Sequence, residues 1–121
     1  MIYIFYIARI LFGGYFLLNG FNHFKNLNSL AGYAGSMKIP SPKTAVTVTG
    51  VLMLIGGLGI LLWFMVPIAV LAIVIFLIPT SFMMHAYWKM SDPMMKMNQK
   101  IQFQKNMAIL AGALAFLLLL Y

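Results

Sequence analysis

The chain has 121 residues, of which 64% are hydrophobic and only 7% are charged, and its formal net charge is +7. A soluble domain carries roughly 25% charged residues, and a fold of this length has too little interior to hide so much apolar surface. The composition therefore excludes a soluble domain and predicts an all-α integral membrane protein, with no nucleic-acid partner. The chain has no cysteine, which excludes disulfides, iron–sulfur clusters and thiolate zinc sites.

Four apolar segments are long enough to cross a bilayer, which requires about 20 mostly apolar residues in a helix. They cover residues 2–21, 44–63, 67–87 and 102–120. Because these segments and their connections use up the chain, we predict a single membrane domain over residues 1–121, folded as a compact four-helix bundle. The first segment lacks a basic region and a cleavage site, so we expect a retained helix and not a signal peptide.

Glycine and alanine are placed where helices of this bundle could approach closely. Gly13 and Gly20 share a face of the first helix, and the second and fourth helices carry further sets: Gly50, Gly56, Gly57 and Gly59, and Ala108, Ala111, Gly112 and Ala115. Small residues allow tight helix packing in lipid, where apolar side chains gain little by leaving the lipid tails.

Two basic connections separate the apolar segments. In residues 22–43, apolar residues recur every three or four positions, which predicts a short amphipathic helix in the membrane interface, ended by Pro40 and Pro42. Residues 88–101, rich in methionine and lysine, are expected to form a loop.

All seven lysines lie in or beside these two connections, which fall on one side of a four-span protein. The positive-inside rule then predicts an inner-membrane protein with cytoplasmic lysine-rich loops and both termini outside. We expect lipid headgroups to contact the following side chains, at about 1 kcal/mol each: Lys25, Lys38, Lys43, Lys96, Lys100 and Lys105.

Arg9 is the most unusual residue of the first apolar segment, because an arginine within the membrane costs at least roughly 2.5–3.5 kcal/mol unless it finds a partner or reaches the interface. The only acid of the chain, Asp92, is expected on the opposite side. Arg9 could therefore reach the outer headgroups, or pair with a backbone carbonyl, a lipid phosphate, a quinone oxygen or a carboxylate of another subunit.

A second group of polar residues is expected at the cytoplasmic ends of the helices. Asn19 and His23 share a helix face, His85 ends the third segment and Asn106 opens the fourth. A histidine here could hydrogen-bond a quinone carbonyl or move a proton. A polar cap over the helix ends, haem ligation by His23 and His85, and a Cu(I) site of Met83, Met84 and His85 remain alternatives.

Two stretches of the chain resemble the DoxX family of small membrane proteins. One is Arg9-Ile-Leu-Phe-Gly-Gly-Tyr-Phe-Leu-Leu-Asn-Gly20, followed by His23-Phe24. The other is His85-Ala-Tyr-Trp-Lys-Met-Ser-Asp-Pro93, followed by Gln102-Phe-Gln-Lys-Asn-Met-Ala-Ile-Leu-Ala-Gly112. The resemblance implies a four-helix inner-membrane protein, and some relatives are linked to quinone-coupled sulfur oxidation or to membrane oxidoreductase assemblies.

The chain has no nucleophile–base pair and no paired carboxylates, so the sequence favours a protein without catalysis of its own. We expect an accessory subunit of a larger membrane complex, serving a redox enzyme. The alternatives are a quinone-interacting redox protein that uses Arg9, His85 and Asn106, and a carrier of small molecules or lipids. Partners would be lipids, other membrane subunits or a second copy of the chain. No cofactor is expected, apart from a quinone in the first alternative.

Overall fold

The structure is a computed structural model that describes residues 1–120, and within that range it contains helices and turns but no strand. The helices are α1 (Ile2–Lys25), α2 (Leu27–Ser36), α3 (Pro42–Leu62), α4 (Val66–Met84) and α5 (Pro93–Leu118), with a 3-10 turn, η1 (Tyr87–Lys89), after α4. Four of these segments are long and apolar enough to span a membrane. The predicted all-α fold with four spanning helices is confirmed; Tyr121, the last residue of the predicted domain, lies outside the described residues.

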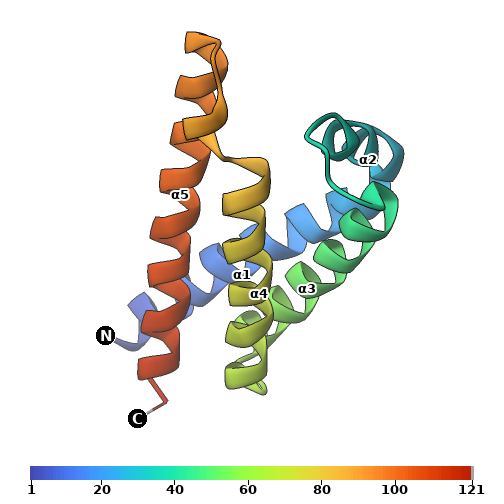
Figure 1. The fold of residues 1–121 in the computed structure, drawn as a ribbon. Helices are drawn as coiled ribbons and strands as arrows, with labels where there is room; N and C mark the ends of the chain where they lie inside the picture. The colour runs from blue at the N-terminus through green and yellow to red at the C-terminus, as the bar shows by residue number, and fades with distance from the viewer. Residues whose placement is uncertain (121) are drawn as a thin grey trace.

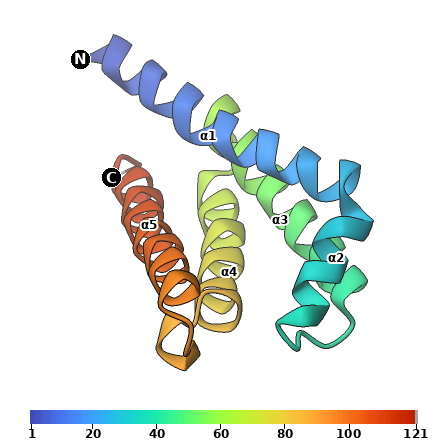
Figure 2. The ribbon, with the colours of Figure 1, turned by 90° about the horizontal axis from the view of Figure 1, so that it is seen from above.

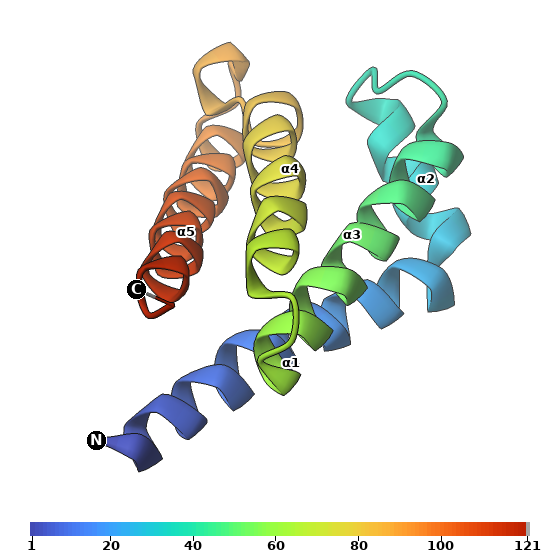
Figure 3. The ribbon, with the colours of Figure 1, turned by 90° about the horizontal axis from the view of Figure 1, so that it is seen from below.

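Spanning helices that follow one another in the chain also pack together: α1 on α3, α3 on α4, and α4 on α5. The short helix α2 packs on α3 and on the end of α1. Figure 1 shows both termini near one end of the molecule, with α2 and the turn before α5 at the other. Figures 2 and 3 show α4 and α5 side by side and α1 passing obliquely across the bundle.

Glycines allow the helices to approach closely, as their positions in the sequence predict. A Cβ on Gly13 would lie 2.8 Å from the carbonyl oxygen of Gly57, so α1 and α3 meet backbone to backbone. A Cβ on Gly59 would lie 2.3 Å from the Cβ of Ala69, so α3 and α4 also approach too closely for a side chain at position 59. Around these contacts the core is filled by large side chains: Phe16, Met53, Ile60, Ile73, Leu77 and Phe116.

The helix ends differ from the predicted bounds because hydropathy locates the lipid-immersed part of a helix and not its ends. Helix α1 continues to Lys25 instead of residue 21, and α3 covers 42–62 instead of 44–63. Helix α4 begins at Val66 and ends at Met84, short of residue 87, since the next residues form η1. The short helix ends at Ser36, well before Pro40, whereas Pro42 begins α3.

The largest correction concerns residues 88–101, which were expected to form a loop but are mostly helical. Helix α5 begins at Pro93 and not at residue 102. The carboxylate of Asp92 caps it by accepting a hydrogen bond from the backbone N–H of Met95 at 3.0 Å, and Pro93 suits the first helical position. The methionines and lysines of this segment therefore lie on a helix, which ends at Leu118.

Candidate functional site

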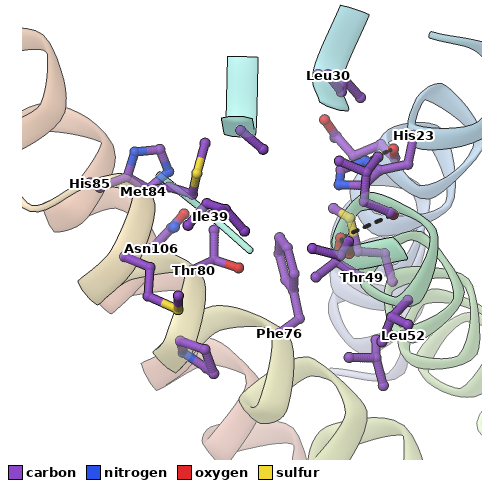
Figure 4. Close-up of a pocket in the computed structure, with 18 of the residues that line it drawn as sticks. His23, Leu30, Ile39, Thr49, Leu52, Phe76, Thr80, Met84, His85 and Asn106 are labelled. Carbon is purple, nitrogen blue, oxygen red and sulfur yellow. Dashed lines mark hydrogen bonds between the residues drawn. The ribbon is translucent and has the colours of Figure 1, made fainter. Parts of the chain in front are cut away.

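A cavity of about 530 Å³ lies at the end of the bundle that carries α2 and the α4–α5 connection. Helices α1 to α4 and the first half of α5 all contribute to its lining. Most of the wall is apolar, with Leu52, Met53 and Phe76 among the lining residues. The side chains shown in Figure 4 surround this space from opposite sides, with Phe76 between them.

The four polar residues expected to gather here all line the cavity: Asn19, His23, His85 and Asn106. The structure therefore brings all four residues to one cavity at this end of the bundle. Figure 4 shows His85 and Asn106 on one side of the cavity and His23 on the opposite side. One detail was wrong: Asn106 does not open the fourth spanning helix but lies well inside it, because α5 begins at Pro93.

His23 is held by the helix on which it lies. Its Nδ1 donates to the carbonyl oxygen of Asn19 at 2.9 Å, one turn earlier in α1. A carbonyl oxygen can only accept, so Nδ1 carries the hydrogen and Nε2 of the neutral ring keeps its lone pair. The side chain of Asn19 in turn donates to the carbonyl oxygen of Tyr15 at 2.7 Å.

His85 belongs to a chain of hydrogen bonds that joins three separate elements. Its Nδ1 lies 2.6 Å from Oε1 of Gln99 on α5, and Nε2 of Gln99 donates to the hydroxyl oxygen of Tyr33 on α2 at 2.8 Å. Gln99 is only 8% exposed. Gln99 and Tyr33 are not among the site residues predicted from the sequence. The cap signal Asp92-Pro93 could have revealed that Gln99 lies on a helix, but nothing in the sequence shows what its amide contacts.

Asn106 is 6% exposed, and its side chain makes no hydrogen bond within residues 1–120. Within residues 1–120, the fully buried side-chain polar atom without a partner is the hydroxyl oxygen of Ser81, so the amide of Asn106 is still accessible from the cavity and can bond a ligand there. The neighbouring Lys105 also lines the cavity, and its ammonium nitrogen lies 5.9 Å from the centre of the Tyr15 ring. The cavity therefore has one positive charge at its edge, and the lone acid of the chain, Asp92, caps α5.

Arg9 is absent from the lining of this cavity, which corrects the grouping of Arg9 with His85 and Asn106. Its guanidinium donates to the carbonyl oxygens of Ile60 at 3.3 Å and Leu61 at 2.8 Å, in the last turn of α3. It also lies against aromatic rings, including that of Trp63, whose centre is 5.6 Å away. Of the partners considered for Arg9, the structure shows the backbone carbonyl.

Metal ligation finds limited support in the described residues. Met83, Met84 and His85 all line the cavity, as the copper alternative requires, but Nδ1 of His85 is engaged with Gln99. Residues 1–120 contain no group of three or more histidine, aspartate or glutamate side chains that could hold a metal ion. The arrangement is better suited to hydrogen-bonding an organic molecule.

Comparison with known proteins supports the resemblance found in the sequence. The model of the DoxX family matches residues 4–86, a stretch that runs from α1 to the end of α4 and includes Asn19, His23 and His85. The match does not extend to α5, so Gln99 and Asn106 lie outside it. No curated protein and no solved structure matches the chain. Because the match covers more than half of the residues, the chain belongs to the DoxX family.

Proposed function

We propose that this membrane protein binds a quinone in the cavity between its helices and serves a membrane redox system. The observation that carries the proposal is the amide of Asn106, which makes no hydrogen bond within residues 1–120 and lies beside His85 in the wall of a mostly apolar cavity. A quinone ring is apolar but carries oxygens at its edge, which need hydrogen-bonding partners when the ring leaves the lipid. Small-molecule sites commonly combine apolar walls with a few polar groups of this kind.

The size of the cavity agrees with this proposal. Ligand sites usually measure roughly 300–1,000 Å³, and the cavity of about 530 Å³ falls within that range. The Met53 and Phe76 side chains offer apolar contacts for the ring, and the open side of the cavity would leave room for an isoprenoid tail.

Binding of a quinone is tested by purifying the protein from native membranes, extracting it with organic solvent and identifying any quinone recovered. The purified protein is then titrated with a decyl-tailed benzoquinone. Replacing Asn106 by leucine should weaken binding by about tenfold, because it removes a hydrogen bond in a buried site. Asn98→Leu, at an exposed position of the same helix, is the matched control and should bind as the unaltered protein does. Equal affinities of the three proteins would reject the site.

A second candidate function is that of an accessory subunit without catalysis of its own. It is favoured by the large exposed surface of the outer helices, since only 11% of the most apolar part of α1 and 17% of that of α5 are buried. Such surfaces could receive lipids, helices of a partner protein or a second copy of the chain. Purification in a mild detergent, followed by mass spectrometry, tests this second function. Copurification of the protein with an oxidoreductase would support the role of an accessory subunit, and purification of the protein without any partner would contradict it.

For the location of the protein, we infer the cytoplasmic membrane, with α2 and the α4–α5 connection on the cytoplasmic side. The seven lysines support this orientation because they lie in α1, α3 and α5 near that end, in the α2–α3 connection and in η1. The same lysines would meet the headgroups of anionic lipids. Addition of vesicles rich in phosphatidylglycerol should therefore stabilise the protein more than vesicles of phosphatidylcholine do.

A further inference from the structure

We propose that Gln99 is a positioning residue that holds His85 as a hydrogen-bond acceptor, so that the site selects the reduced, hydroxyl-bearing form of its ligand. This inference rests on the proposed function, since it assumes that a quinone-type ligand occupies the cavity. Beyond that function, it states which of the two redox forms, the quinone or the hydroquinone, is bound more tightly. It also assigns a role to two residues, Gln99 and Tyr33, that had none.

The two partners of Gln99 fix the orientation of its amide. Its nitrogen, Nε2, donates to the hydroxyl oxygen of Tyr33 at 2.8 Å, so its oxygen, Oε1, is the atom that faces His85 at 2.6 Å. An amide oxygen can only accept a hydrogen bond, and Nδ1 of His85 must therefore carry the hydrogen. In a neutral imidazole only one nitrogen is protonated, so Nε2 of His85 is left with its lone pair.

His23 on the opposite side of the cavity has the same tautomer for an independent reason. Its Nδ1 donates to the backbone carbonyl oxygen of Asn19 at 2.9 Å, which can only accept. Both histidines of the cavity thus use Nδ1 to bond the protein. Neither Nε2 makes a hydrogen bond to any other residue of the described chain.

His85 and Asn106 lie on the same side of the cavity in Figure 4, so one polar group of a ligand could meet both. A hydroxyl group can donate its hydrogen to Nε2 of His85 and accept one from the amide of Asn106. A quinone carbonyl can accept from Asn106 but leaves the lone pair of His85 facing another lone pair. Sites built to hydrogen-bond a hydroxyl discriminate against analogues that lack it, because the buried protein group is left unpaired.

The test uses the full chain in lipid nanodiscs at about pH 8, where an ordinary histidine is neutral. Dissociation constants are measured without oxygen for a decyl-tailed hydroquinone and for the corresponding benzoquinone. We expect the hydroquinone to bind at least about tenfold more tightly. In Gln99→Leu the ratio should fall towards one, whereas Gln104→Leu, at an exposed position of the same helix, should keep it.

Nitrogen NMR of the imidazole rings supplies a second readout that needs no variant, so it decides the question even if Gln99→Leu does not fold. We expect His85 of the unaltered protein to carry its hydrogen on Nδ1. A hydrogen on Nε2, equal affinities for the two redox forms, or an unchanged ratio in a folded Gln99→Leu protein would overturn the inference. Failure of the unaltered protein to bind either form would instead overturn the proposed function, and the inference with it.

Discussion

Arg9 stabilises the end of a neighbouring helix. The last carbonyls of a helix mark the negative end of its dipole, and Arg9 donates to two of them, those of Ile60 and Leu61. The carbonyl of Ile60 also accepts from the backbone N–H of Trp63 at 3.4 Å. Replacing Arg9 by methionine should therefore destabilise the protein by about 1.5–3 kcal/mol, the usual range for hydrogen bonds to a charged group. Denaturation by a rising fraction of ionic detergent measures the loss.

Ligand binding serves as the control for this prediction. Arg9 is absent from the cavity lining, so quinone affinity should be the same in the folded Arg9→Met protein. Arg9→Lys keeps the charge but loses the planar guanidinium that reaches both carbonyls. The stability of Arg9→Lys should therefore fall between that of the unaltered protein and that of Arg9→Met. Full stability of Arg9→Met would show that the two hydrogen bonds contribute nothing.

Four of the cavity residues could be predicted from the sequence, but the contacts of His85 could not. Asn19, His23, His85 and Asn106 could be grouped because polar residues are rare in these helices and each lies near a helix end or a basic connection. Gln99 lies within a run of polar and basic residues, where an amide carries no distinguishing signal. It is buried where it contacts His85, which follows α4, and Tyr33 of α2, and its bond to Tyr33 joins residues 66 positions apart.

Glycine packing controls the contact between α3 and α4. A Cβ at position 59 would lie 2.3 Å from the Cβ of Ala69, and the backbone oxygen of Phe64 is also close, at 3.1 Å. Gly59→Ala should therefore destabilise the bundle, by about 1–3 kcal/mol as for other overpacked sites. Gly14→Ala is the matched control, since a Cβ there meets nothing within 4 Å and alanine favours a helix by roughly 0.5–1 kcal/mol. Thermal unfolding of the two variants in one detergent compares them; equal stability would contradict the prediction.

Helix α2 covers the cavity, to which it contributes Leu30, Tyr33 and Ala34. It packs on α1 and α3, and Tyr33 also joins it to α5 through Gln99. If the ligand enters beneath α2, a thiol-specific cross-linker between Tyr33→Cys and Gln99→Cys should slow exchange of bound quinone several-fold. The chain has no cysteine, so the reagent joins only the introduced thiols.

The doubly substituted protein without the cross-linker is the control, because it lacks the same hydrogen bonds but leaves α2 free. Stopped-flow displacement of a fluorescent quinone analogue gives the exchange rate in both states. Equal rates would show that the ligand enters by another route.

The number of helices could be predicted from sequence, whereas their ends could not. Long apolar segments must be helical in lipid, because no water is present to bond the backbone. At the ends this constraint disappears: residues 22–25 are polar or basic apart from Phe24 and still continue α1. The start of α5 was in principle predictable, since Asp92-Pro93 is an N-cap followed by a first-turn proline.

The orientation of the whole molecule is testable through its two kinds of connection. Ser29 on α2 and Phe64 between α3 and α4 are both exposed and lie at opposite ends of the bundle. With cysteine at position 64, a membrane-impermeant maleimide should label intact cells, because this connection is expected outside. With cysteine at position 29, labelling should require permeabilised cells. The reverse pattern would place the lysines outside.

The unequal lengths of α1 and α4 make the cavity sensitive to the membrane around it. Helix α4 has 19 residues, or about 28 Å, close to the hydrocarbon thickness of about 30 Å, whereas α1 has 24 residues, or about 36 Å, and its mostly polar end, residues 22–25, extends beyond its apolar part. Figure 1 shows α1 running obliquely to α4 and α5, so α1 and α4 cannot both stand upright in a bilayer. A thinner or thicker bilayer changes the tilt of the longer helix first. Because α1 and α4 both line the cavity, the acyl-chain length of the surrounding lipid should alter quinone affinity, measurable in vesicles of short-chain and long-chain phosphatidylcholine.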